Sequence, residues 1–311
     1  MTRLSTRGRS IVALAGLLVI ALLLCIFTVP TSARADTSVR YGVRPIYPEN
    51  QRSDRDGHFN LRVTPGMVQV VEVEVQNLGD RVAVVEISAN AAYTNENGVM
   101  EYIPLPDQAA PAQASRAAHQ PSFAEMVTAN ESLLEVAPGT SGIATFTIRV
   151  PESAFEGVLL GGFHFVEAIA HQSGESRARG ETDAHTGVVN RMAYAIPVVL
   201  REEDDVPPPA FALQGVARDA SYTDALRITL RNTAGRIAHL EQFAAILYAQ
   251  GGDAPLETLT LPMIQMTPYA EPNLRVWRDT RAPLPAGHYR LQVSFVCEDT
   301  LYVLEEIFAL V

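Results

Sequence analysis

The chain has 311 residues, of which 47% are hydrophobic and 19% charged, enough for about two ordinary domains with buried cores. All 24 basic residues are arginines, which excludes a lysine Schiff base, a phosphate-loop lysine and a lysine–asparagine cross-link. The formal charge of −11 makes nucleic acid a poor partner, because a negative surface repels phosphate polymers.

The first 35 residues have the pattern of a secretory signal peptide. Three arginines precede an apolar run over residues 11–27, and Ala33-Arg34-Ala35 follows as a small-x-small cleavage pattern. We expect cleavage after Ala35; the alternative is an uncleaved membrane anchor, because the run approaches spanning length. In both cases the remainder is expected to be exported. Residues 36–311 keep 20 arginines against 35 acidic residues, a formal charge of −15. Their single cysteine, Cys297, excludes an internal disulfide and is expected to be an inert core thiol.

Alternating apolar and polar residues predict β-strands along most of the exported part. Val71, Val73 and Val75 alternate with polar neighbours, and similar runs follow at 81–89, 141–150, 226–231 and 289–295. Residues 158–166 and 192–200 are apolar on both faces, which is typical of central strands, and only 122–127 suggest a helical turn. The pattern predicts an all-β chain of two tandem immunoglobulin-like β-sandwich domains after the signal peptide.

The clearest domain boundary is the acidic, proline-rich run EEDDVPPP at residues 202–209. Four adjacent acids cannot pack together, and three prolines favour an extended spacer. We therefore predict a signal peptide at 1–35, a first sandwich at 36–203, a linker at 204–209 and a second sandwich at 210–311.

No catalytic or metal-binding motif is found in the sequence. None of the seven histidines lies in a His-Glu-x-x-His pattern or beside paired cysteines, and no Gly-x-Ser-x-Gly or phosphate-binding glycine loop is present. We predict no enzyme, no cofactor and no metal. A wall hydrolase would need two carboxylates facing across a cleft, which sequence spacing leaves open.

Several short sequence motifs along the chain are informative when taken together. They lie at 43–51 (VRPIYPENQ), 57–61, 64–66, 88–98 (SANAAYTNENG), 156–163 (EGVLLGGF) and 194–202, with looser blocks at 266–268 and 285–289. This set resembles the WxL-interacting proteins of Gram-positive cell surfaces. The resemblance implies a first domain that binds peptidoglycan and a second that contacts partners, including host surface ligands. It also implies assembly with exported WxL-domain surface proteins. The only tryptophan precedes Arg-Asp instead of x-Leu, so this chain is expected to be the interacting partner.

The family usually ends in a membrane-spanning helix, whereas residues 301–311 form only a strand-length apolar stretch. We therefore expect attachment through the wall, through partners or through an uncleaved signal segment, unless the sequence continues beyond Val311.

We expect ligand binding from two polar segments of the first domain. Glu49, Asn50 and Gln51 could hydrogen-bond glycan hydroxyls or stem-peptide amides, or instead staple the first strand to a neighbour. Tyr93, Asn95 and Asn97 could stack on or bond a wall sugar, or instead pack and form a tight turn.

In the second domain, Trp277 is a candidate partner-binding residue if exposed and a core residue if buried. Together these features predict a non-enzymatic cell-surface adaptor. The alternative is an exported two-domain chaperone-like protein that binds client strands along a sheet edge.

Overall fold

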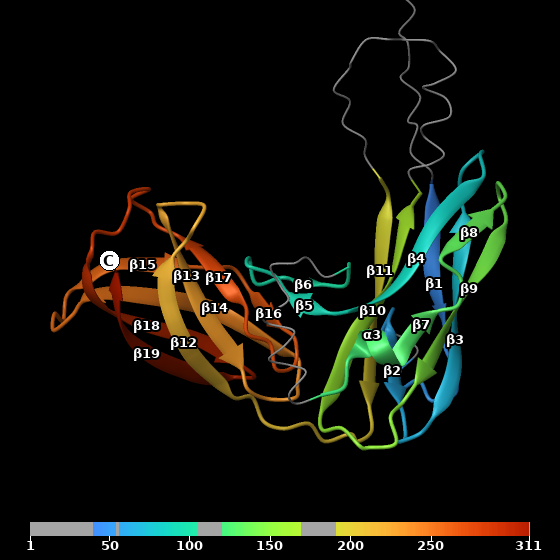
Figure 1. Cartoon of the computed structure of the whole chain (residues 1–311), viewed down its shortest axis with the longest axis horizontal. Coiled ribbons are helices and arrows are strands. Elements are labelled where there is room, and N and C mark those ends of the chain that lie inside the picture. Colours follow the sequence, from blue (N-terminus) through green and yellow to red (C-terminus); the bar gives the residue numbers. More distant parts are fainter. Residues whose placement is uncertain (1–39, 54–55, 105–119, 169–190, 311) are drawn as a thin grey trace, which may run out of the picture. The chain divides into compact units, whose positions relative to one another are not determined.

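The computed structural model describes residues 40–53, 56–104, 120–168 and 191–310 (Figure 1). The predicted signal peptide lies outside these residues. Residues 39–311 form one compact unit, and its described part consists of β-strands with a single short helix. Two pairs of sheets make up this unit, which confirms the predicted all-β fold of tandem sandwiches. Among the described residues, no helix is long and apolar enough to cross a membrane.

The first sandwich contains a four-stranded and a five-stranded sheet. The four-stranded sheet has the order β1 (Tyr41–Ile46), β3 (Val68–Asn77), β9 (Ser141–Arg149), β7 (Val127–Ala129). The five-stranded sheet has the order β2 (Phe59–Arg62), β11 (Ala193–Arg201), β10 (Val158–Glu167), β4 (Ala83–Ala91), β8 (Leu133–Val136). Neighbouring strands are antiparallel except β2 and β11, which are parallel. The two doubly apolar stretches form β10 and β11, and both strands have neighbours on each side as predicted.

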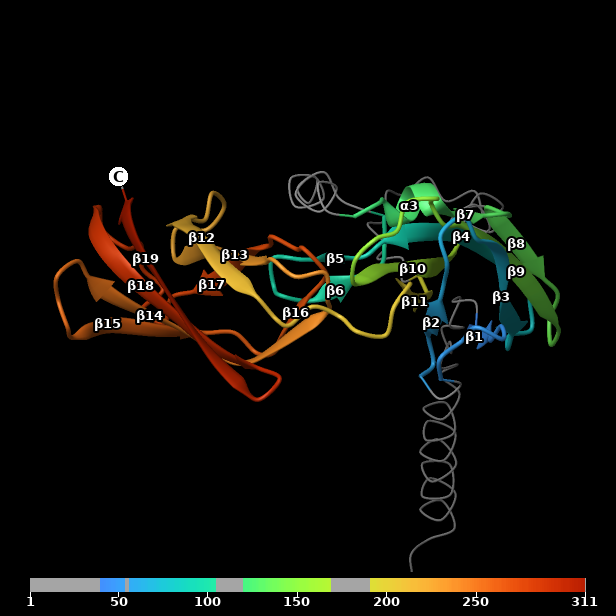
Figure 2. The same ribbon diagram turned by 90° about the horizontal axis from the view of Figure 1, so that it is seen from below.

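The second sandwich pairs a three-stranded sheet with a larger one (Figure 2). The smaller sheet has the order β12 (Phe211–Arg218), β13 (Ala225–Asn232), β17 (Asn273–Trp277). The larger has the order β15 (Pro255–Thr260), β14 (Ala238–Ala249), β18 (Gly287–Cys297), β19 (Thr300–Leu310), and β16 (Ile264–Met266) also pairs with β14. A separate hairpin of β5 (Tyr93–Thr94) and β6 (Met100–Glu101) follows β4.

Each sandwich encloses an apolar core built from the inward residues of its alternating strands. In the first core the Phe146 and Phe163 rings stack at a centroid distance of 3.6 Å. The predicted helical turn is α3 (Phe123–Met126), which places Phe123 and Met126 in this core beside β10 and β7 (Figures 1 and 2). In the second core Cys297 is 2% exposed and burial raises the pKa of its thiol, as expected for a packing residue. Each fully buried valine, leucine, isoleucine, phenylalanine or methionine side chain of the two cores contributes about 1.5–3 kcal/mol to stability because it is removed from water.

A third, smaller apolar cluster connects the two sandwiches. Its buried members are Ala92, Val158, Leu160 and Val199 of the first sandwich. Val206 of the linker and Ile237, just before β14, pack against them. The linker therefore takes part in a core instead of acting only as an extended spacer.

Candidate functional site

A shallow depression of about 480 Å³ lies on the first sandwich, where the chain leaves β1 and enters β2. Its lining contains all three candidates of the first predicted segment, Glu49, Asn50 and Gln51. The other lining residues are Arg52, Arg62, Thr64 and Met67. The predicted wall-contact segment thus forms one concave surface with two arginines that the sequence did not single out.

The side-chain amides of Asn50 and Gln51 are bound within the protein. Asn50 exchanges two hydrogen bonds with the Gln69 amide, at 2.9 and 2.8 Å, and donates a third to the Arg62 carbonyl at 2.8 Å. Gln51 Nε2 donates to the carbonyls of Ser53 and His58, and Gln51 Oε1 accepts from the Asn60 N–H. These bonds match the stapling alternative, because they fix the segment after β1 to β2 and β3. The Glu49 side chain remains exposed.

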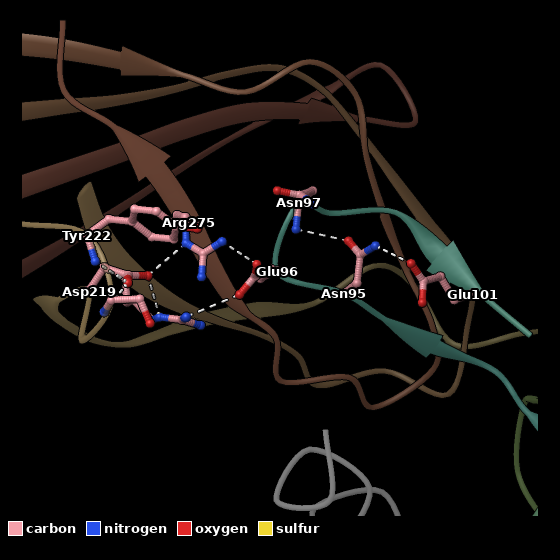
Figure 3. A network of polar contacts seen from close by, with 9 residues as sticks. Asn95, Glu96, Asn97, Glu101, Asp219, Tyr222 and Arg275 are labelled. Atoms are coloured by element: carbon pink, nitrogen blue, oxygen red, sulfur yellow. Dashed lines mark hydrogen bonds and ion pairs between the residues drawn. The ribbon is translucent and has the colours of Figure 1, made fainter. Parts of the chain in front are cut away.

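The second predicted segment forms the β5–β6 hairpin, residues 93–101, which we call the clasp hairpin. The Asn95 amide donates to Glu101 Oε1 at 2.6 Å, and Asn95 Oδ1 accepts from the N–H of Asn97 (Figure 3). Asn95 Oδ1 also accepts from the N–H of Val99. Asn95 and the exposed Asn97 therefore build the tight turn that the composition indicated. Tyr93 is 6% exposed and its hydroxyl donates to Glu101, so burial and the neighbouring carboxylate raise the pKa of Tyr93. Ligand binding by these three residues stays a prediction, and their contacts are those of a scaffold.

The clasp hairpin is bound to the second sandwich through backbone groups. The Gln265 N–H donates to the Gly98 carbonyl and the Arg275 N–H to the Glu96 carbonyl, both at 2.7 Å. The Thr94 hydroxyl also donates to the Gln265 carbonyl at 3.0 Å. Gly98 has φ +76°, and a Cβ there would lie 3.0 Å from Ile264, so this turn requires glycine for its conformation and for its close approach.

A charged network surrounds the tip of the clasp hairpin (Figure 3). The Glu96 carboxylate forms ion pairs with Arg227, at 3.1 Å, and with Arg275. Both guanidiniums also contact Asp219 Oδ2, each through Nε at 2.8 Å. The Asp219 side chain is fully buried, and burial opposes its charge. The Arg275 hydrogen bond, two backbone N–H groups and nearby Arg227 outweigh burial and lower the pKa of Asp219 to about 2.

A second direct contact between the sandwiches lies at Gly157. The Val158 N–H donates to the Gly235 carbonyl at 2.7 Å, and a Cβ on Gly157 would lie 2.0 Å from that same oxygen. Gly157 also has φ +76°. Gly157, the second residue of the EGVLLGGF block, is therefore required where the two sandwiches touch.

Trp277 ends β17, next to the charged network, and is half-buried. Its ring meets Tyr222 edge-on at 4.9 Å, and the Arg281 guanidinium lies over it at 5.1 Å. Tyr222 is 44% exposed. Trp277 is neither a core residue nor fully exposed, and it belongs to a partly accessible aromatic–arginine patch formed by Tyr222, Trp277 and Arg281.

The linker acids do not form a metal centre. A second depression of about 520 Å³ is lined in part by Glu156, Glu202, Glu203 and Asp205. Across the residues that the structure describes, no group of three or more histidine, cysteine, aspartate or glutamate side chains is placed to hold a metal ion.

Comparison with protein families decides the identity of the chain. Residues 41–167 match the family model described as the WxL Interacting Protein peptidoglycan binding domain, and residues 183–310 match the one described as the WxL Interacting Protein host binding domain. The chain belongs to the WxL-interacting protein family. No curated protein matches it. The family's host binding model begins at residue 183, yet β11 (Ala193–Arg201) pairs with β10 and β2 in the first sandwich.

Solved structures that match this chain include the CsuC–CsuE chaperone–tip adhesion subunit pre-assembly complex of Acinetobacter baumannii. It shares 11% identity over 85% of this chain and 98% of that chain, with a TM-score of 0.43. The E. coli chaperone DraB shares 11% identity over 88% and 98%, with a TM-score of 0.33. The Pseudomonas aeruginosa CupB2 chaperone shares 8% identity over 78% and 93%, with a TM-score of 0.30.

Sequence reasoning found the segments of this WxL-interacting protein but missed the charged residues that surround them. Glu96 lies between the candidates Asn95 and Asn97, and its ion-pair partners Arg227 and Arg275 are 131 and 179 residues further along the chain. The only local signal for Glu96 was an acid at the tip of a turn, which is ordinarily a solvated position.

Proposed function

We propose that the protein is a non-enzymatic adaptor of the cell surface. Its first sandwich binds peptidoglycan and its second binds a protein partner, either an exported WxL-domain protein or a host surface ligand. The observation that supports this most directly is that models of a peptidoglycan binding domain and a host binding domain match consecutive parts of one chain.

We place the wall contact at the depression that contains Glu49, Asn50 and Gln51. The internal bonds of Asn50 and Gln51 favour this role, since they hold the segment in one conformation and so reduce the entropy lost on binding. Exposed Glu49, Thr64 and the two arginines then supply the groups that face a ligand.

We place the partner contact at the aromatic–arginine patch of Tyr222, Trp277 and Arg281. Partly exposed tryptophan, tyrosine and arginine side chains are the types that most often anchor protein interfaces. The edge-on contact between Tyr222 and Trp277 and the position of Arg281 over the Trp277 ring restrict their rotamers before a partner arrives, which favours binding.

The clasp hairpin gives this adaptor a physical advantage over two domains on a flexible spacer. Its backbone bonds to Gln265 and Arg275 hold the two sandwiches together, so both ligands are bound by one body. A wall-bound first sandwich therefore holds the second at a fixed reach, which raises the effective concentration of its partner site.

A bridging experiment tests the proposal. Residues 36–311 are incubated with purified peptidoglycan, washed at physiological salt, and then offered a soluble WxL-domain protein. We expect the WxL-domain protein to sediment with the wall only when the adaptor is present, and Trp277→Ala to remove this capture while leaving adaptor retention unchanged. Failure of residues 36–311 to sediment with peptidoglycan would refute the wall-binding role.

A further inference from the structure

Two arginines, Arg52 and Arg62, line the depression on the first sandwich, and a third, Arg201, lies beside them. Arg62 of β2 and Arg201 of β11 are register partners in the parallel pair, and Arg52 follows the bridge between Gln51 and Leu61. The Arg52 guanidinium lies 3.2 Å from Asp204 Oδ1, and that of Arg62 lies 3.4 Å from Asp204 Oδ2. Asp204 thus forms ion pairs with two arginines, one through each carboxylate oxygen.

One buried hydrogen-bond donor of these three arginines has no acceptor within the described part of the chain. Arg201 Nε is buried and has no hydrogen-bond partner among the described residues. Burial and the neighbouring charge of Arg52 lower the pKa of Arg201, while Asp204 acts in the opposite direction. Three guanidiniums thus lie near the Asp204 carboxylate, although residues 36–311 as a whole carry a formal charge of −15.

The ion pairs that Asp204 forms with Arg52 and Arg62 can also be replaced easily by pairs with another carboxylate. The side chains of Asp204, Arg62 and Arg52 are 55%, 59% and 34% exposed, so water reaches all three. Ion pairs this exposed contribute little stability, and a competing carboxylate can replace Asp204 at small cost. A guanidinium presents a planar fork of N–H groups that matches the two oxygens of a carboxylate.

We propose that Arg52 and Arg62 bind the C-terminal carboxylate of the peptidoglycan stem peptide, and that Asp204 occupies the same position when the ligand is absent. This inference rests on the proposed function, since both arginines lie in the stretch matched by the peptidoglycan binding model. The rest of the depression suits a peptide, because Glu49 offers an acceptor for its N–H groups, Thr64 a hydroxyl and Met67 an apolar contact. Asp204 lies outside that stretch, so the linker is expected to compete with the wall for this site.

The test uses residues 36–311 and two probes: peptidoglycan with and without its teichoic acid, and a synthetic stem peptide as free acid and as C-terminal amide. The Arg52→Gln/Arg62→Gln variant is compared with Arg44→Gln/Arg149→Gln, which changes the net charge equally at exposed arginines of β1 and β9. We expect the first variant to bind the free acid about tenfold more weakly or worse, because charge-assisted bonds to guanidinium are lost, and the control to bind like wild type. The amide should bind all proteins as weakly as the free acid binds Arg52→Gln/Arg62→Gln.

Asp204→Asn supplies the opposite readout, which a merely unfolded variant cannot give. Removing the internal competitor should strengthen free-acid binding about two- to fivefold, consistent with an exposed ion pair, while Glu203→Asn leaves it unchanged. Equal binding by wild type and Arg52→Gln/Arg62→Gln, or equal binding of acid and amide, would overturn the inference and leave the proposed function standing. Retention of the protein only on walls that still carry teichoic acid would overturn the assignment of a carboxylate ligand and indicate a phosphate ligand. Absence of wild-type retention on any wall would overturn the proposed function itself.

Discussion

Removal of the Glu96 carboxylate tests whether the clasp hairpin couples the two sandwiches. In Glu96→Gln the ion pairs to Arg227 and Arg275 are lost, but both guanidiniums keep Asp219 at 2.8 Å. Glu96 is 36% exposed, so each pair is worth only about 0.2–1 kcal/mol and the variant should lose about 1 kcal/mol of unfolding free energy. In a unit of this size that corresponds to a fall in Tm of about 2–4 °C.

Asp219→Asn provides the contrast within the same network. Its carboxylate is fully buried, and its removal leaves the partly exposed Glu96 as the carboxylate partner of both guanidiniums among the described residues. Removing one partner of a buried ion pair costs about 3–5 kcal/mol. This variant should therefore lose several times as much unfolding free energy as Glu96→Gln. Guanidinium chloride unfolding is followed by the fluorescence of Trp277, the chain's only tryptophan, which lies two residues from Arg275.

Hydrogen exchange distinguishes coupling from simple destabilisation. The amides of Gln265 and Arg275 donate to the clasp hairpin, so Glu96→Gln should speed their exchange more than that of amides in β18. Glu135→Gln, at an exposed position of β8, removes the same charge and should change neither stability nor exchange. If Glu96→Gln left these two amides as protected as in wild type, or destabilised the protein as much as Asp219→Asn, the coupling argument would be wrong.

Three further predictions concern single residues. Gly157→Ala should destabilise by more than about 2 kcal/mol in chemical unfolding, since its Cβ meets a backbone oxygen at 2.0 Å. Gly251→Ala, at φ +77° with open space around it, should cost only the conformational strain of about 1–2 kcal/mol. Phe163→Ala should cost about 3–5 kcal/mol by opening a cavity beside Phe146, and a loss below 1 kcal/mol would contradict the stacked core. Because the pKa of Asp219 is lowered to about 2 from 3.8, its stabilisation is complete above pH 4 and is lost as pH falls toward 2. Asp219→Asn should therefore flatten the pH dependence of unfolding free energy in that window; an unchanged slope would count against the ion pairs.

Local patterns in the sequence determined most of the strands. Val71, Val73 and Val75 all point into the core, since side chains alternate strictly across a strand and one face of β3 is wet. Pro65-Gly66 precedes β3, and Gly287 is the first residue of β18. These signals lie within a few residues of one another, so no knowledge of the folded chain is needed to read them.

The sites depended on contacts that no local pattern encodes. Asn50 and Asn95 are candidates from polar segments, and in the structure their amides bond to Gln69 and Glu101. Only the tertiary structure brought Glu96 to Arg275 and Arg62 to Asp204, across 179 and 142 residues. The two-residue period of a strand determines which of its residues point into the core. The partner of an exposed charged residue depends instead on how separate parts of the chain pack together. For this protein, the sequence alone therefore determined the fold and the family, whereas packing between the sandwiches decided which charged groups meet.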